Sequence, residues 1–170
     1  MALTREEIIG AGMAILDAYG LADLTMRRVA DELGVQAGAL YYHVPNKQSL
    51  LSGLADEVLG HLGDSQTLAE WARDYRRSLL EHRDGAELVA ATRATRLGRV
   101  DPTERAMEIL PDADVVATFE YFVLGATLHD QTQSQLAELG VVDVFDQAAA
   151  EARFHRGVAI LEAGTETAAE

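Results

Sequence analysis

The stretch LTMRRVADELGVQAGALYYHVPNKQSLL, residues 24–51, decides the fold. Thr25 is a favoured N-cap residue in front of an amphipathic run, and Gly34 ends that run as a residue that tolerates positive φ. A second, short helix is expected over residues 37–43. Pro45 ends it, because the residue before a proline is pushed away from helical angles. Two short helices joined by a glycine turn predict a helix-turn-helix.

The short second helix has too few apolar residues to be a core element. Leu40 is its expected buried anchor, which leaves Tyr41, Tyr42 and His43 outside or along the rim. In a helix-turn-helix the second helix enters the major groove of DNA and reads base edges. The aromatic residues are therefore interpreted as a DNA-facing surface, with local packing against the bundle as the alternative.

The charge of the chain is strongly negative but unevenly distributed. The formal net charge over the 170 residues is −14, yet residues 1–50 hold four basic and six acidic side chains and contribute only −2. Most of the acidity therefore lies outside the opening segment, where it would suppress non-specific binding to DNA. A local basic patch within residues 25–47 stays compatible with a polyanionic partner.

Composition indicates the class of protein and its compartment. The chain has no cysteine, so neither disulfides nor thiolate chemistry are expected. The sequence contains no apolar run long enough to span a bilayer, and its N-terminus lacks the pattern of a signal peptide. We expect a cytoplasmic globular protein with no membrane association.

Apolar residues recur at helical spacing through the chain, which predicts an all-α fold. Thr4 and Glu7 have the spacing of a capping box for a first helix that ends at Gly20. Asn46 caps a fourth helix that carries an apolar face as far as Leu62. Further helices are expected over residues 68–82, 85–97, 115–139 and 144–163, with a proline-broken stretch at 98–111.

Residues 4–62 resemble the DNA-binding segment of the TetR family of bacterial one-component repressors. The resemblance rests on the blocks LT-x-R-x-VA-x-x-LGV, LYYHV and NK-x-x-LL. Two later segments, HRDGAEL and LGATLHDQ, resemble the regulatory domain of the tetracycline-responsive members. The resemblance implies a three-helix helix-turn-helix domain over residues 1–46. It also implies a helical ligand-binding and dimerisation domain over residues 47–170.

The resemblance also implies two sets of DNA contacts. The residues that would contact phosphates, or support those that do, are Thr25, Tyr42, His43 and Lys47. The residues that would face base edges are Arg27, Gln36, Ala37, Gly38, Ala39 and Tyr41. Ala37 and Gly38 stand where tetracycline-responsive members have a glutamine and a proline. Since neither can hydrogen-bond a base through a side chain, we expect a different operator, with Arg27 as the reader of a guanine. The alternative is that Arg27 and Arg28 are only solvated charges.

The regulatory half departs further from the tetracycline-responsive members. Val89 stands at the position of a histidine that helps to hold magnesium, Gly63 replaces a second histidine, and His129 replaces an acidic residue. Without these ligands a magnesium complex is not expected, and neither is another metal or cofactor. We expect a smaller or more apolar effector. Its predicted pocket walls are Trp71, Tyr75, Leu79, His82, Leu88, Val89, Thr92, Phe119 and Phe122.

The function expected from these patterns is a homodimeric transcriptional repressor. It would bind a palindromic double-stranded operator, dimerise through its last two long helices and be released by a small effector. Two alternatives stay open: an effector-independent regulator, and a ligand-binding relative whose DNA function is weakened by residues 37–39. An enzyme is not expected, because no nucleophile, base and orienting group cluster in the sequence. The triplet at residues 82–84 matches a protein-kinase catalytic loop, but Val89 stands where that loop needs an asparagine.

Overall fold

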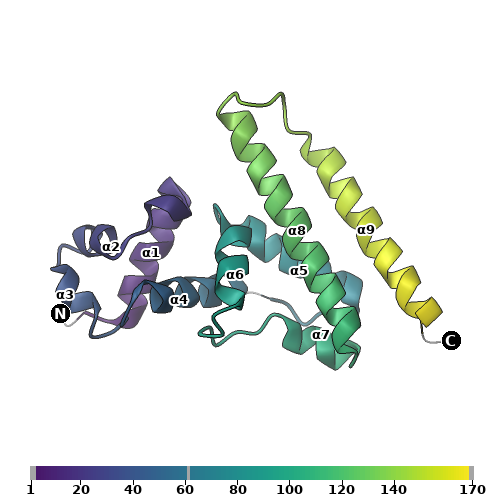
Figure 1. Cartoon of the computed structure of the whole chain (residues 1–170), viewed down its shortest axis with the longest axis horizontal. Helices are drawn as coiled ribbons and strands as arrows, with labels where there is room; N and C mark the ends of the chain where they lie inside the picture. The colour runs from purple at the N-terminus through teal and green to yellow at the C-terminus, as the bar shows by residue number, and fades with distance from the viewer. Residues whose placement is uncertain (1–2, 61, 169–170) are drawn as a thin grey trace. The chain divides into compact units, whose positions relative to one another are not determined.

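The computed structural model describes residues 3–60 and 62–168, and helices are the only regular secondary structure within those ranges. The all-α prediction is confirmed. Contacts divide the chain into two compact units, one of residues 1–61 and 79–100 and one of residues 62–78 and 101–170. Figure 1 labels the helices of both units. This division groups residues by packing. The functional boundary between residues 46 and 47 stays a prediction.

The first unit contains the predicted helix-turn-helix. Its elements are α1 (Arg5–Tyr19), a 3-10 turn (Leu21–Asp23), α2 (Met26–Glu32), α3 (Ala37–Leu40), α4 (Lys47–Leu59) and α6 (Gly85–Arg93). Helix α1 packs against α2 and α4, α3 packs on α2, and α6 packs on α4. Ile8, Leu16, Val29 and Leu54 are fully buried in this unit. Their burial fixes the small bundle that carries α3.

Local signals set both ends of α1. The Thr4 hydroxyl accepts a hydrogen bond from the Glu7 amide at 3.1 Å, and the Glu7 carboxylate accepts one from the Thr4 amide at 2.8 Å. The predicted capping box is confirmed. Gly20 ends the helix with φ of +87°, and a Cβ there would lie only 2.6 Å from the carboxylate of Asp84. The position therefore requires glycine both for its backbone angle and for space.

The turn between α5 (Leu68–Leu80) and α6 is hydrogen-bonded to the C-terminal end of α1. Asp84, at φ of +54°, accepts a hydrogen bond from the Leu21 amide at 2.7 Å. From the other side, Asp17 of α1 accepts one from the Arg83 amide at 3.3 Å and lies 3.1 Å from Nδ1 of His82. Residues 82–84 match the triplet of a kinase catalytic loop in sequence. In the structure they hold the turn between α5 and α6 against α1.

The second unit contains most of α5 together with α7 (Thr103–Ile109), α8 (Ala113–Glu138) and α9 (Gln147–Ala168). The two long helices form an antiparallel hairpin (Figure 1). They approach closely at Gly157, where a Cβ would lie 2.1 Å from the ring of Phe122. That ring stacks on Phe154 with centroids 5.4 Å apart. A glycine on α9 therefore makes room for an aromatic residue of α8.

A buried arginine joins three helices of the second unit. Arg76 of α5 has a side chain only 5% exposed, and its guanidinium lies 2.8 Å from the carboxylate of Asp130 on α8. Glu151 of α9 lies 3.4 Å from the same guanidinium, which also sits 4.6 Å from the ring centroid of Phe154. Buried charges need such partners, because burying an unpaired ion costs on the order of several kcal/mol.

Several helix boundaries differ from the sequence predictions. The helix predicted over residues 37–43 has regular geometry only over α3, and the chain then turns, with the His43 amide donating to the Leu40 carbonyl at 3.0 Å. The fourth helix ends at Leu59, before Leu62, and α6 ends at Arg93 rather than residue 97. Arg96 explains the last difference, since its φ of +52° is incompatible with a right-handed helix.

Candidate nucleic-acid interface

The turn between α2 and α3 is built from short-range backbone signals. The Thr25 hydroxyl caps α2 by accepting a hydrogen bond from the Arg28 amide at 3.1 Å. Gly34 takes φ of +66° after the helix, and the Val35 amide donates back to the Ala30 carbonyl at 3.0 Å. Gln36 precedes α3 in an extended conformation without a side-chain cap bond. Its amide side chain is exposed and stays available to an external partner.

Leu40 fixes which face of α3 points outward. Its side chain is fully buried, as are those of Val29 and Val44, while Leu33 is half-buried. The predicted anchor is therefore confirmed. The opposite face carries the predicted base-reading and phosphate positions. Among them Gln36, Gly38, Ala39, Tyr41 and Tyr42 are exposed, and Ala37 and His43 are half-buried.

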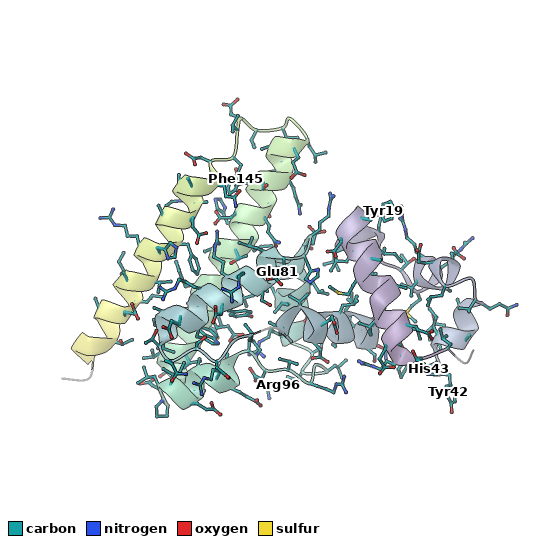
Figure 2. All side chains as sticks on the ribbon, turned by 180° about the vertical axis from the view of Figure 1, so that it is seen from behind. Tyr19, Tyr42, His43, Glu81, Arg96 and Phe145 are labelled. Carbon is teal, nitrogen blue, oxygen red and sulfur yellow. The ribbon has the colours of Figure 1, made fainter. Side chains whose placement is uncertain are left out.

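The two tyrosines after α3 differ in how far they leave the protein. Tyr42 is 88% exposed, whereas Tyr41 is 49% exposed. The Tyr42 and His43 rings make a T-shaped contact, with centroids 5.1 Å apart at an interplanar angle of 82°. Both side chains are labelled in Figure 2. Contact with one neighbouring ring does not bury an aromatic side chain. Tyr42 is thus not part of the core, and its role in meeting DNA stays a prediction.

The paired arginines of α2 have different surroundings. The Arg27 side chain is 89% exposed and has a loose ion pair, 3.9 Å, with Asp31, which is 71% exposed. The guanidinium of Arg28 makes an ion pair with Asp23 and lies 3.9 Å above the ring of Tyr19. Arg28 is thus held by the protein itself, and Arg27 is free to reach a base or a phosphate.

Lys47 occupies the first position of α4. Asn46 caps this helix by accepting a hydrogen bond from the Ser49 amide at 2.9 Å, as predicted. The Lys47 side chain is exposed, and no acidic group of the described residues pairs with it. A cation at a helix N-terminus is disfavoured by the helix dipole. A phosphate at this place would relieve that penalty.

The protein itself does not require a glycine at position 38. A Cβ built there would meet no atom of the described residues within 4 Å. Gly38 lies inside α3 and does not have a positive φ. Glycine inside a helix costs about 1 kcal/mol relative to alanine. Close approach of a partner to the backbone is a physical reason to keep it.

The predicted effector residues fall in both units. Leu79, His82, Leu88, Val89 and Thr92 belong to the first, and Trp71, Tyr75, Phe119 and Phe122 belong to the second. All except His82 and Phe122 are buried. The indole N–H of Trp71 donates to the Pro102 carbonyl at 2.7 Å, and the Thr92 hydroxyl donates to carbonyls of its own helix. Their role in binding an effector stays a prediction.

The described part of the chain has neither a cluster of metal ligands nor a membrane-spanning helix. Within it, no three His, Cys, Asp or Glu side chains gather in a way that could hold a metal ion. None of the helices there has the length and apolar character needed to cross a membrane.

Two regions of the chain match known families. Residues 8–54 match the family described as "Bacterial regulatory proteins, tetR family", and residues 60–168 match the "Tetracyclin repressor-like, C-terminal domain". The tetracycline repressor protein class A from transposon 1721 of Escherichia coli is 30% identical to the chain. That alignment covers 95% of the chain and 90% of the relative.

Solved structures extend the similarity to the whole fold. The crystal structure of BioQ from Mycobacterium smegmatis is 36% identical and superposes with a TM-score of 0.85, covering 95% of this chain and 97% of that one. A structure of BioQ with its natural double-stranded DNA operator is 34% identical, with a TM-score of 0.80 and the same coverages.

Proposed function

Because the chain belongs to the tetR family of bacterial regulatory proteins, which are DNA-binding transcriptional repressors, we propose the following mechanism of repression and release. It binds a two-fold symmetric operator as a homodimer and leaves the operator when a small apolar effector binds. It carries no enzymatic activity. The resemblance inferred from residues 4–62 is confirmed by the family match and by the fold.

The observation that supports the proposed DNA contacts is the solvent-exposed face around α3. Arg27, Tyr42 and Lys47 are all exposed, and none of them is held by the core. The proposal gives Arg27 a guanine edge and gives Lys47 a phosphate, since arginine is the bidentate partner of guanine in the major groove. Ala37 and Ala39 present only methyl groups to the bases. Such groups favour contact with the methyl of thymine.

Dimerisation is assigned to α8 and α9, as expected from the sequence. Tyr121 of α8 is 71% exposed and Ile160 of α9 is 65% exposed, although both are apolar. Gly125 of α8 and Gly164 of α9 have no described atom within 4 Å of a built Cβ. Small residues beside exposed large ones suit the close packing of a helical bundle from two subunits. A dimer also matches the symmetry of a palindromic operator.

The effector would act through α4, which follows α3 directly in the chain. Asp56 of α4 accepts hydrogen bonds from the amides of Arg99 and Val100 at 2.7 and 3.0 Å, so α4 is tied to the segment after α6. A shift of α4 would change the separation of two recognition helices from one turn of DNA, roughly 34–36 Å. The effector then acts by shifting the population toward dimers that do not fit the operator.

The apolar character of the effector is supported by the residues assigned to its pocket. Most of them are aliphatic or aromatic, and the side chain of Val89 offers no atom that could bind a metal. Magnesium with tetracycline is therefore not proposed as the effector.

Selection of bound sequences from random duplex DNA tests the proposal. The expected product is a palindrome whose half-sites are spaced by about one helical turn. Recovery of no symmetric sequence would overturn the repressor assignment and favour a ligand-binding relative with weakened DNA function. A symmetric site that no hydrophobic small molecule displaces would favour the effector-independent regulator.

A further inference from the structure

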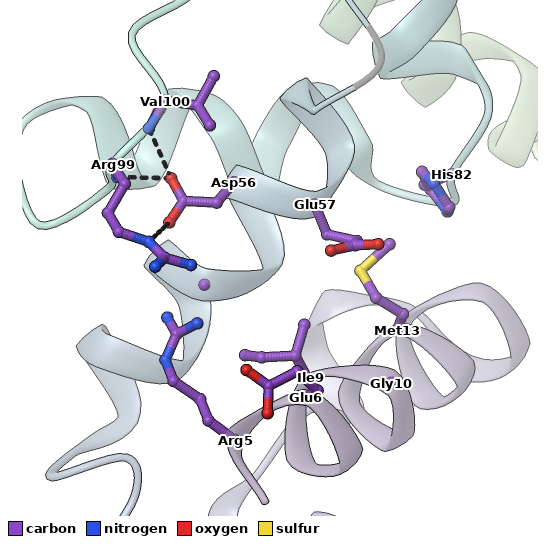
Figure 3. A pocket seen from close by; sticks show the side chains of 11 residues that line it. Arg5, Glu6, Ile9, Gly10, Met13, Asp56, Glu57, His82, Arg99 and Val100 are labelled. Atoms are coloured by element: carbon purple, nitrogen blue, oxygen red, sulfur yellow. Dashed lines mark hydrogen bonds and ion pairs between the residues drawn. The ribbon is translucent and has the colours of Figure 1, made fainter.

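A groove of about 770 Å³ lies within the first unit, and none of its lining residues belongs to the surface assigned to DNA. It runs between α1, α4 and the segment that follows α6 (Figure 3). Ile9, Met13 and Val100 form apolar walls. Gly10 adds open backbone, since a Cβ built there would meet no described atom within 4 Å. This groove has both the volume and the apolar lining to hold a small molecule.

One arginine enters the groove without an acidic partner. Arg5 is half-buried, and no carboxylate of the described residues lies within ion-pair distance of it. Its guanidinium lies against the backbone of α4, where a Cβ on Gly53 would be 2.8 Å from Nη2 of Arg5 and 2.6 Å from Ile9. A buried glycine inside a helix is thus what lets Arg5 lie over α4. A half-buried cation in this position is available to an anion.

A second arginine faces the first across the groove. Figure 3 shows the guanidinium groups of Arg5 and Arg99 pointing toward one another. The Arg99 guanidinium lies 3.7 Å from Asp56, whose other oxygen already accepts the amides of Arg99 and Val100. Asp56 is therefore shared among several donors and does not neutralise both arginines. Two like charges that converge on one space favour an anionic ligand between them.

The remaining charges of the groove define the class of that ligand. Glu6 and Glu57 lie at its exposed rim, and His82 faces Asp17 of α1 rather than the arginines. Rim carboxylates repel a multiply charged anion such as phosphate more strongly than a monoanion. We propose that the groove binds a small monocarboxylate with an apolar chain. Its carboxylate lies between Arg5 and Arg99, and its chain lies along Ile9 and Met13.

Octanoate is the probe for this proposal, with binding followed by two-dimensional NMR of methyl-labelled isoleucine and methionine. The expected result is saturable shifts of the Ile9 and Met13 methyl signals. Arg5→Gln and Arg99→Gln should each raise the dissociation constant about tenfold or more, since hydrogen bonds to charged groups contribute that much. Gly10→Leu should abolish the shifts by filling the groove.

The controls separate the carboxylate from the apolar chain and from surface charge. Octan-1-ol and octylammonium should bind at least about tenfold more weakly than octanoate. Arg77→Gln, on the exposed surface of the second unit, should leave octanoate binding unchanged. Thermal unfolding by circular dichroism verifies that each variant is folded. Octanoate shifts that persist in both arginine variants, or equal binding of octan-1-ol, would overturn the proposal. Neither readout uses DNA, so failure of the operator assignment leaves this test intact.

Discussion

The guanidinium of Arg28 lies 3.9 Å from the ring centroid of Tyr19 and so covers that ring, while the neighbouring Arg27 has an almost fully exposed side chain. The family resemblance assigns a guanine contact to Arg27, but the sequence leaves open that both arginines are only solvated charges. The structure separates them into one that stabilises the first unit and one that can reach DNA.

Replacing Arg27 with alanine should therefore impair recognition, and replacing Arg28 should impair stability. Arg27→Ala is expected to cost about 1–3 kcal/mol in operator binding and to relax base preference at one position in each half-site. Arg28→Ala should lower the free energy of unfolding by about 0.5–1 kcal/mol, the value of an exposed cation–π contact. Competition binding with single-base operator variants distinguishes them. Unchanged base preference in Arg27→Ala would refute its role as a reader.

Lys47→Gln should weaken binding to every duplex by the same factor. A phosphate contact carries no sequence information, and its loss removes about one unit from the slope of log K against log salt concentration. Fluorescence anisotropy over a range of salt concentrations measures that slope. The matched variant Arg77→Gln in the second unit should keep the original slope. A sequence-dependent loss in Lys47→Gln would assign it to bases instead.

Two glycine-to-alanine variants should change stability in opposite directions. A Cβ on Gly85 would lie 2.3 Å from the carbonyl oxygen of Leu79, so Gly85→Ala should lower the free energy of unfolding by about 1–3 kcal/mol. Gly10 has open space around it, so Gly10→Ala should raise that free energy by about 0.5–1 kcal/mol through helix propensity. Urea unfolding measures both changes. Equal effects would show that the α5–α6 turn adjusts without strain.

The buried ion pair of the second unit should be far more sensitive than an exposed one. Asp130→Asn leaves Arg76 buried without its main countercharge and is expected to lower the free energy of unfolding by about 3–5 kcal/mol. Glu108→Gln removes the carboxylate of the exposed ion pair between Arg105 and Glu108 and should change stability by less than about 1 kcal/mol. Thermal unfolding of the two variants gives the comparison, and similar losses would contradict it.

A charge on the outer face of α9 should prevent dimerisation. Ile160→Glu is expected to yield monomers, because a carboxylate would be buried without a partner at the subunit interface. Leu97→Glu introduces the same charge at an exposed apolar residue of the first unit and should leave the dimer intact. Light scattering coupled to gel filtration reports the mass. A dimeric Ile160→Glu would place the interface elsewhere.

The features that could be predicted from the sequence are those set by neighbouring residues. The capping box of Thr4 and Glu7, the cap at Asn46 and the anchor Leu40 all follow from spacings of a few residues, and each is present. Helix ends were less predictable. Arg96 has a positive φ, which its residue type does not predict. For that reason α6 ends before residue 97, where the sequence predicted its end.

Contacts between distant residues could not be predicted. Nothing in the sequence links Asp84 to Leu21, or Arg76 to Asp130, because these pairs exist only once the helices have packed. The position of Arg5 in the groove likewise depends on Gly53. These two residues are far apart in the sequence, so their contact could not be predicted from it. The resemblance to a family supplied the DNA-facing positions, Arg27 among them. The structure adds that Arg28 is engaged with Tyr19 and Asp23, whereas Arg27 is exposed.

The empty space around Gly38 has a consequence for how operator preference can change over generations. Substitutions of buried residues in a small domain compromise folding before they can alter recognition. At Gly38 an added Cβ would meet no described atom within 4 Å, and alanine there would gain helix propensity, so folding does not require the glycine. The position can accept new residues as target promoters diverge. It is also a natural starting point for engineering repressors that ignore one another's operators.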